Sequence, residues 1–525
     1  MFLLRRRVVV AAVAATALLI PALPAVPAAA AVIRYEAENA TISQGSVATN
    51  HTGFSGTGFV DYTNVAGSYV EWTVSAAQAG TASLSLRYAN GTSTNRPMDI
   101  SVNGTVVAVD QPFGGTGSWD AWAISTLTAG LLAGTNTVRA TATTSNGGPN
   151  VDWLEVNDQP TAGTDWSVAV VESTMARFSP DTLGGWGYTR GLYLYGQYLV
   201  YQRTHDPRYL AYIKSWADRF VDSSGNISQS FNNLDSMQAG NVLLILSRET
   251  GQSRYRIAAQ KIRTRLNTYP RTSDGGFWHS TSDTRQGQLW ADGTFMVNPF
   301  LIRYGQLFND STYANDEAAR QLEVYGKHLF RTSGNAAGLL YHAYDEPGGL
   351  TASWVHPELG NTNGISWCRA IGWYAMATID VLEILPVTHP KRPVLLTNVQ
   401  TLVNAFARFQ DPFTGRWFQV VDLGSNSNNW TETSCSSMYT FTISRAVERG
   451  YVSSTFQTYA DRGYQGVLKR ISLGSDGRTN LTEICIGTNV DDSTSFYFDR
   501  PRATNDFHGL GAFLIMNEQM IRTGH

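Results

Sequence analysis

Two long stretches of the chain differ in the spacing of their apolar residues. From about residue 32 to 158, apolar and polar residues alternate in short runs such as SYVEWTVSA and ASLSLRYA, which are separated by Gly, Asn and Ser. A period of two is typical of antiparallel strands with one buried face. Residues 32–158 are therefore predicted to form an all-β sandwich of the jelly-roll type.

From residue 165 onward the apolar spacing becomes three and four, as in Val168, Val171, Met175 and Phe178, which predicts amphipathic helices. The segment 159–164 between the two regions is predicted to be a linker. Six helices are expected to begin directly after a polar or aromatic cluster, and a second, amphipathic helix follows each of them. The clusters lie at Trp186, Asp235, Asp292, Arg369, Ser434 and His508.

Six such hairpins closed into a ring form an (α/α)6 barrel over residues 165–525, with residues 165–178 as the twelfth, outer helix. A superhelix of tetratricopeptide-like hairpins is the competing architecture. Its repeat would stay near a constant length of about 34 residues, whereas the gaps between the clusters are longer and unequal. The barrel is therefore preferred.

The first 31 residues are predicted to be a signal peptide, because three arginines precede a short apolar run and then VPAAAA. This predicts a secreted, extracellular protein, since the apolar run is too short to span a membrane. The net charge of −3 and the absence of a basic run argue against nucleic acid as a partner. The odd number of cysteines (Cys368, Cys435 and Cys485) argues against a disulfide framework, although one bridge is possible.

One acid stands out in the stretch QLWADGTFMVNP. Asp292 lies among Trp290 and Phe295 with no basic residue in the stretch. A buried carboxylate without a partner is costly when ionised and responds by taking up a proton. The routine alternative is that Asp292 caps the helix that follows.

The barrel favours a functional role for Asp292 over simple capping, because the N-terminal ends of all inner helices would meet at one face. Aromatic rings, carboxylates and an arginine would then converge there, as in a sugar-binding site. The residues brought together would be Trp186, Tyr188, Asp235, Asp292, Arg369, Trp373 and His508, with His342 contributed by a long insert above them.

The helical region resembles the unsaturated rhamnogalacturonyl hydrolases of glycoside hydrolase family 105 and the related family 88. The matching stretches include WGYTRGLYL, LDSMQAG, WADGTFMVNPFL, GLLYHAYDE, SWCRAIGWY and NDFHGLGAF. The resemblance implies a glycosidase without a catalytic cofactor. Such an enzyme removes an unsaturated uronic acid from the non-reducing end of lyase-generated oligosaccharides, here acidic pectic ones such as galacturonyl-rhamnose from rhamnogalacturonan. It also implies that Asp292 and Asp235 are catalytic, and that the substrate is bound by Trp186, Tyr188, His342, Arg369 and Trp373.

The expected reaction is hydration of the C4=C5 enol ether. A neutral Asp292 would donate a proton to C4, water would add at C5, and the same carboxylate would accept the proton of water. This requires a raised pKa, which burial and the nearby Asp235 would supply. Plainer roles stay open for several residues: Asp235 as a helix cap, Arg369 as the partner of an acid, Trp373 as core and His508 as a brace where the barrel closes.

The β region resembles carbohydrate-binding module family 35 in the stretches RYEAENA, GFSGTGFVDY, GSWDAWA and GPNVDWLEV. The resemblance implies a structural Ca²⁺ held by Glu36, Glu38 and Asp152, and carboxylates suit this hard cation. Two acids one residue apart on a strand would face the same side; solvated edge charges are the alternative. Arg96, Trp119 and Asn150 are the predicted contacts to a sugar.

Two other classes of function stay open. The barrel is compatible with a polysaccharide lyase that uses a Tyr or His base and creates unsaturated ends. A carbohydrate-binding protein without activity is the other alternative, although the presence of Asp235, Asp292, His342 and Arg369 argues against it. The uronate could derive from either galacturonate or glucuronate.

Overall fold

The computed structural model describes residues 33–525 apart from 77–79, 133, 158–163, 349–350 and 475. The chain divides into two compact units, residues 1–163 and 164–525. The predicted signal peptide and all of the predicted linker except Thr164 lie outside the described residues. Among the helices in the described ranges, none is both long and apolar enough to cross a membrane.

The first unit is a sandwich of two antiparallel sheets, as predicted. One has the order β3-β4-β11-β6-β9 with β1 paired to β11, and the other has the order β2-β5-β10-β7-β8. In β5, the alternating residues Val70, Trp72 and Val74 are buried in the core between the sheets. The strands are β1 Ile33–Glu36, β2 Thr41–Ser43, β3 Gly45–Ala48, β4 Phe59–Tyr62, β5 Tyr69–Ala76, β6 Gly80–Ala89, β7 Met98–Val102, β8 Thr105–Gln111, β9 Ala123–Leu131, β10 Gly134–Ala142 and β11 Asn150–Asn157.

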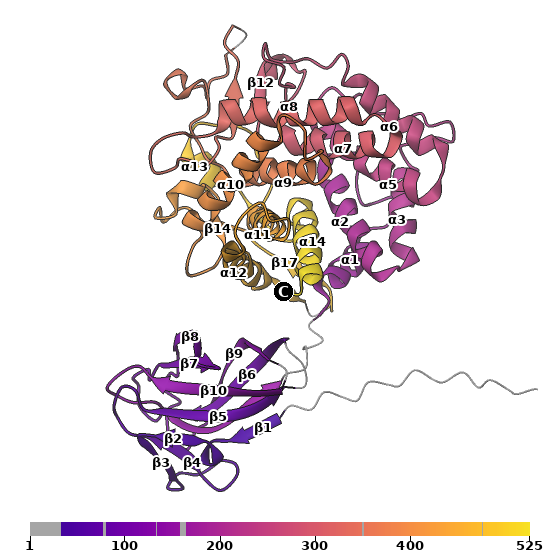
Figure 1. The fold of residues 1–525 in the computed structure, drawn as a ribbon. Helices are drawn as coiled ribbons and strands as arrows, with labels where there is room; N and C mark the ends of the chain where they lie inside the picture. The colour runs from indigo at the N-terminus through magenta and orange to yellow at the C-terminus, as the bar shows by residue number, and fades with distance from the viewer. Residues whose placement is uncertain (1–32, 77–79, 133, 158–163, 349–350, 475) are drawn as a thin grey trace, which may run out of the picture. The chain divides into compact units, whose positions relative to one another are not determined.

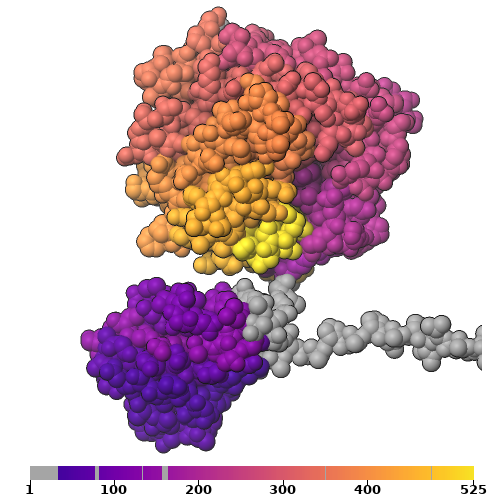
Figure 2. Space-filling model, in the orientation of Figure 1, coloured from indigo at the N-terminus to yellow at the C-terminus, as the bar shows by residue number. Residues whose placement is uncertain are grey.

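The second unit is the predicted barrel of helical hairpins. Its inner helices contact one another in a closed ring, α2-α5-α7-α9-α11-α14, and α14 returns to α2 (Figure 1). The space-filling view shows this closure, because the yellow C-terminal residues lie beside the magenta start of the unit (Figure 2). The inner helices are α2 Tyr188–Thr204, α4 Asp235–Gln238 continued by α5 Gly240–Thr250, α7 Gly293–Phe308, α9 Cys368–Ile384, α11 Thr433–Glu448 and α14 Phe507–Thr523.

The outer helices pack against this ring from outside. They are α1 Trp166–Arg177, α3 Pro207–Ala217, α6 Ser253–Arg265, α8 Ser311–Leu329, α10 Arg392–Phe409 and α12 Gln457–Leu468. The predicted twelfth helix is thus α1. Short strand pairs lie in the loops that lead into the inner helices: β12 Gln288–Trp290 with β13 Ala343–Asp345, β14 Trp417–Phe418 with β15 Thr431–Glu432, β16 Ile471–Leu473 with β17 Thr479–Leu481, and β18 Ile484–Cys485 with β19 Arg502–Ala503.

Glycines allow the inner helices to pack closely. A Cβ atom on Gly372 of α9 would lie 2.6 Å from the sulfur of Met438 on α11, and one on Gly511 of α14 would lie 2.5 Å from Leu192 on α2. These distances are far below van der Waals contact, so larger residues would force neighbouring helices apart. The glycines of CRAIGW and HGLGAF therefore serve the closed ring.

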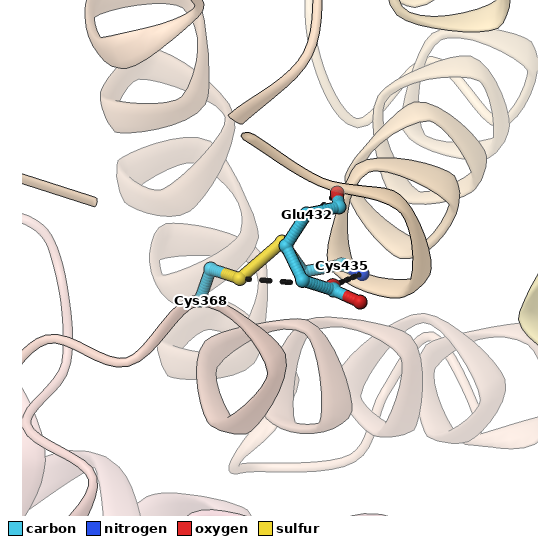
Figure 3. A group of neighbouring side chains, drawn as sticks. All are labelled: Cys368, Glu432 and Cys435. Carbon is cyan, nitrogen blue, oxygen red and sulfur yellow. Dashed lines mark hydrogen bonds between the residues drawn. A yellow bond between two sulfur atoms is a disulfide. The ribbon is translucent and has the colours of Figure 1, made fainter. Parts of the chain in front are cut away.

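A disulfide joins the first turns of two inner helices. Cys368 of α9 and Cys435 of α11 are bonded, with their Cα atoms 5.7 Å apart, and Cys485 is free and buried. Glu432 lies beside this bridge (Figure 3) and is fully buried. Its carboxylate accepts hydrogen bonds from the backbone N–H groups of Ser434, Cys435 and Cys485. The single bridge that the sequence left possible is present.

Reduction of this disulfide should destabilise the protein. The bridge spans 67 residues of sequence, and cross-linking a loop of that length stabilises a fold by about 4 kcal/mol through the entropy of the unfolded chain. Chemical unfolding with and without reductant measures the difference. The double variant Cys368→Ser/Cys435→Ser should match the reduced protein, whereas Cys485→Ser should still respond to reductant. Equal stability of oxidised and reduced wild-type protein would contradict the prediction.

Candidate active site

The predicted site forms at the N-terminal ends of the inner helices. Strand β12 runs directly into α7 and pairs with β13 of the long insert, with Trp290 opposite Ala343. One residue further, the N–H of Ala291 donates to the carbonyl oxygen of His342 at 2.9 Å. This pairing places the side chain of His342, 50 positions away in sequence, beside that of Asp292.

Asp292 has a partner that its own sequence stretch did not reveal. Its Oδ2 atom lies 3.1 Å from Nε2 of His342, and the other ring nitrogen, Nδ1, lies 2.8 Å from the Tyr497 hydroxyl. His342 is completely buried, so it supports Asp292 rather than offering a surface to a sugar. The side chain of Asp292 accepts no hydrogen bond from the first turn of α7, which excludes the capping role.

The protonation of the two acids differs from the expectation. Burial pushes the pKa of Asp292 upward, but the charge and hydrogen bonding of His342, together with weaker contributions from its other neighbours, hold that pKa below its ordinary value. Burial and the negative charge of Asp292 instead raise the pKa of Asp235 to about 7. The prediction that Asp292 carries the raised pKa was therefore wrong. Of the two acids, Asp235 is therefore the one that takes up a proton more readily as the pH falls toward neutrality.

Asp235 opens α4 without capping it. The first N–H groups of this helix are served by Asn233, whose side chain accepts from the N–H of Ser236 at 2.8 Å. One third of the Asp235 side chain remains exposed, and Nε2 of the buried His279 lies 3.8 Å from its carboxylate. Its capping role is thus excluded, and the carboxyl group is accessible to a ligand.

Three of the predicted aromatic residues surround the acids. The indole N–H of Trp186 donates to the carbonyl of Ser236 at 2.7 Å, which ties the segment just before α2 to α4. Tyr188 packs edge-on against Trp373, and Trp373 stacks on Phe295 of α7. Trp373 is 1% exposed and belongs to the core, whereas Trp186 and Tyr188 are partly exposed.

Arg369 and His508 both hold the scaffold together. The Arg369 guanidinium is 1% exposed and donates to the carbonyls of Cys485 and Ile486, the latter at 2.7 Å. His508 lies between Asp506 and the Tyr188 hydroxyl, which is 2.6 Å from its Nε2 atom. His508 therefore braces α14 against α2, where the barrel closes. Binding of a uronate by Arg369 stays a prediction.

Three residues that the sequence did not single out complete the site. His279 stacks on Trp290 with ring centres 4.2 Å apart, and burial lowers its pKa to about 3, so it is neutral. Tyr497 anchors His342, and Arg285 lies over Trp290 at 4.5 Å. His279 and Trp290 lie close together in sequence, so their stacking could have been suspected from the sequence. Tyr497 is 155 positions from His342, and only the fold brings the two together.

In the first unit, the predicted calcium ligands surround one loop. Ser55 donates from its hydroxyl to Glu36 and from its N–H to Asp152, and the N–H of Thr57 donates to Glu38. Glu38 lies in the 3-10 helix Ala37–Asn39, so the expectation that both glutamates share a strand was wrong. Their carboxylates nevertheless converge, because a Cβ on Gly56 would meet both side chains.

The acid set of the first unit leaves one carboxylate oxygen without a protein partner. The Oε2 atom of Glu38 is buried without a hydrogen-bond partner, and the fully buried Asp152 also pairs with Arg87. Within the described residues, another group has three metal-ligand atoms within 4.8 Å of one another. It consists of Cys368, Glu432 and Cys435 of the second unit. There the two sulfurs are bonded to each other.

The predicted sugar contacts of the first unit are only partly assembled. The guanidinium of Arg96 lies 5.4 Å from the Trp119 ring, and it donates to Asn64 and to the carbonyl of Gly148. Asn150 is 4% exposed at the start of β11 and offers little surface to a ligand. Arg96 and Trp119 therefore form the more accessible part of this candidate site.

Comparison with known proteins identifies both units. Residues 166–523 match the family model of Glycosyl Hydrolase Family 88, which covers more than half of the chain. The chain belongs to Glycosyl Hydrolase Family 88. Residues 33–159 match the model of carbohydrate binding module (family 35).

Individual relatives agree with this assignment to family 88. The chain is similar to the unsaturated rhamnogalacturonyl hydrolase YesR of Bacillus subtilis (strain 168), with 24% identity over 344 residues, which are 64% of this chain and 90% of that protein. It is also similar to a family 105 glycoside hydrolase structure from C. acetobutylicum ATCC 824, with 32% identity, a TM-score of 0.63 and coverage of 68% of this chain and 100% of the other.

The first unit has its own relative outside family 88. It is 58% identical over 120 residues to the exo-beta-D-glucosaminidase of Amycolatopsis orientalis, a match of 23% of this chain. The chain spans only 12% of the length of that protein. Membership of family 88 makes the second unit a glycosidase-type enzyme, and family 35 makes the first unit a carbohydrate-binding module.

The raised pKa of Asp235 predicts how stability depends on pH. An aspartate in an unfolded chain has a pKa of about 3.9, so between that pH and about 7 the folded family 88 enzyme holds the proton more tightly. This contribution to stability is lost as the pH rises through about 7. In wild type, an ionised Asp235 destabilises the folded state above about pH 7, and Asp235→Asn cannot ionise. The gain in melting temperature of the variant over wild type should therefore be larger at pH 8 than at pH 5. The control Asp181→Asn, at a side chain that is 85% exposed, should show no such difference.

Proposed function

We propose that this protein removes an unsaturated uronic acid from the non-reducing end of acidic oligosaccharides that lyases produce, and that rhamnogalacturonan is the parent polymer. The two acids carry this proposal, because the pKa of Asp235 is raised to about 7 while that of Asp292 lies below its ordinary value. Hydration of an enol ether needs a proton donor for carbon and a base for water at the same pH. Asp235 and Asp292 supply both, and the charge of Asp292 reaches Asp235.

The residues divide these tasks between them. Asp235 donates its proton to C4, and cationic character develops at C5 and the ring oxygen. Water adds at C5 and gives a proton to Asp292, which His342 keeps ionised and in place. The resulting hemiketal opens and releases the rest of the sugar chain, and the proton on Asp292 returns to Asp235. This assignment replaces the single acid/base expected from the sequence.

The lyase alternative makes the opposite change to the double bond. A lyase creates C4=C5 bonds on intact polymer, whereas the proposed hydrolase consumes them on oligosaccharides already cut. The similarity to the unsaturated rhamnogalacturonyl hydrolase of Bacillus subtilis supports rhamnogalacturonan as the source of the substrate. We further propose that the protein is exported by its predicted signal peptide and meets these oligosaccharides outside the cell.

Absorbance of the conjugated double bond tests the proposal. Wild-type protein should lower the ultraviolet absorbance of lyase-digested rhamnogalacturonan and leave that of the intact polymer unchanged. Asp292→Asn and Asp235→Asn should each lose at least about 10²-fold in rate, the low end for general acid–base catalysis. Unchanged melting curves would exclude a folding defect. Rising absorbance on undigested polymer would overturn the proposal.

The pH profile separates the two acids. In wild type the rate should fall as the pH rises through about 7, because Asp235 then loses its proton. Asp235→Asn should lack this alkaline limb altogether. If the limb persists in Asp235→Asn and merely moves to lower pH, Asp292 is the proton donor instead.

We also propose that the first unit binds Ca²⁺ through Glu36, Glu38 and Asp152 and recognises acidic sugars through Arg96 and Trp119. The buried, unbonded Oε2 of Glu38 supports the calcium site, since carboxylate oxygens are its preferred ligands. The cation–π contact of Arg96 with Trp119 supports the sugar site, because it presents a flat ring and a cation together.

Calcium should therefore stabilise the full chain. The melting transition should rise in Ca²⁺ and fall after chelation, by the mass action of an ion that binds the folded state alone. Glu38→Gln and Asp152→Asn should abolish this response. Glu155→Gln, at a surface acid that pairs with Arg34, should keep it. Isothermal titration that detects no calcium binding to wild type would remove the site.

A further inference from the structure

The arginine expected to bind the uronate, Arg369, already donates hydrogen bonds to the backbone of the protein. Arg369 is buried, and both of its terminal nitrogens donate to backbone carbonyls of residues 485 and 486. Releasing it for a substrate would leave those carbonyls without partners, which costs about 1–3 kcal/mol for each. Another cation is better placed to meet a carboxylate.

Arg285 is that cation. It is partly exposed and ends the short helix Asp283–Arg285, just before β12 leads to Asp292. Its guanidinium lies 4.5 Å from the ring centre of Trp290, and the same tryptophan stacks on His279 with ring centres 4.2 Å apart. The positive charge of Arg285 reaches both Asp235 and His279.

The guanidinium of Arg285 is held but not saturated. Among the described residues its one recorded hydrogen bond runs from Nη2 to Oδ1 of Asn489 at 3.0 Å. Asn489 belongs to the segment after β18 whose carbonyls Arg369 fixes, and the adjacent Val490 packs against Trp290 and Trp354. Arg285 is thus held by the side-chain amide of Asn489 and by the ring of Trp290. Its remaining donors are free for the fork-like pairing that guanidinium groups make with carboxylates.

We propose that Arg285 binds the carboxylate of the uronic acid and makes the site selective for charged sugars, and that Asn489 is its positioning residue. This rests on the proposed function, and it names Arg285 rather than Arg369 as the determinant of acid recognition. Contact with an aromatic ring alone does not show that an arginine binds substrate. The experiment therefore measures selectivity for charged over uncharged sugars.

The test compares the unsaturated disaccharide with its methyl ester. Arg285→Met keeps the apolar contact with Trp290 and removes the charge. It should raise KM for the acid roughly 10- to 100-fold, the range for a hydrogen bond to a charged group, while the ester is affected much less. Asn489→Ala should weaken acid selectivity in the same direction but less. Arg256→Met, at an exposed arginine over Phe308 on the outer surface, should behave as wild type.

The pH profile provides a second readout that a merely structural role would not move. The groups whose charges or contacts reach Asp235 are Asp292, His279, Tyr188, Tyr269 and Arg285. Arg285 lowers the pKa of Asp235, so its removal should shift the alkaline limb to higher pH. An unchanged acid-to-ester ratio together with an unmoved limb would overturn the proposal.

The two proposals fail in different ways. Inactive wild-type protein on every unsaturated oligosaccharide would contradict the proposed function. In that case, tryptophan fluorescence titrations with galacturonate and galactose still test Arg285. Wild type should prefer galacturonate and Arg285→Met should lose the preference; equal preference in both proteins would overturn the inference.

Discussion

Two carboxylates held close together among aromatic rings are the constraint on which this site depends. Water screens like charges poorly in such surroundings, so Asp235 and Asp292 cannot both ionise easily near neutral pH, and they titrate as a pair. The position of His342 decides which of them keeps the proton. That position follows from the pairing of β12 with β13, which places the histidine beside the acid at the start of α7.

The loops around the pair are held by a third acid, which is fully buried. Glu432 accepts hydrogen bonds from the first turn of α11 and from the N–H of Cys485. A carboxylate at a helix N-terminus is favoured by the helix dipole, and hydrogen bonds to its oxygens offset the cost of burial. The same segment then receives Arg369 at its carbonyls and supplies Asn489 to Arg285. Glu432 thus helps to fix the segment that bonds to Arg369 and Arg285.

Periodicity was sufficient to predict the sandwich, the barrel and the starts of the inner helices, because burial dictates these patterns directly. It also placed Asp235 and Asp292 at one face. It did not predict their protonation, since His342 meets Asp292 only through strand pairing across a long insert. Arg369 was expected to face the substrate, but the carbonyls that occupy it belong to a segment more than a hundred residues away. Likewise, the 3-10 turn that carries Glu38 depends on contacts that alternation along a strand does not encode.

An anionic substrate intensifies the electrostatic problem that the site already has. A uronate brings one more negative charge to a place where Asp292 is ionised, and this raises the pKa of Asp235 further. The proton donor therefore stays protonated over a wider pH range once substrate is bound. The same repulsion weakens binding unless a cation compensates it, and both terminal nitrogens of the buried Arg369 are already bonded to backbone carbonyls. A partly exposed arginine at the edge of the site resolves this conflict, because it can neutralise the substrate without becoming a permanent partner that would strip the proton from Asp235.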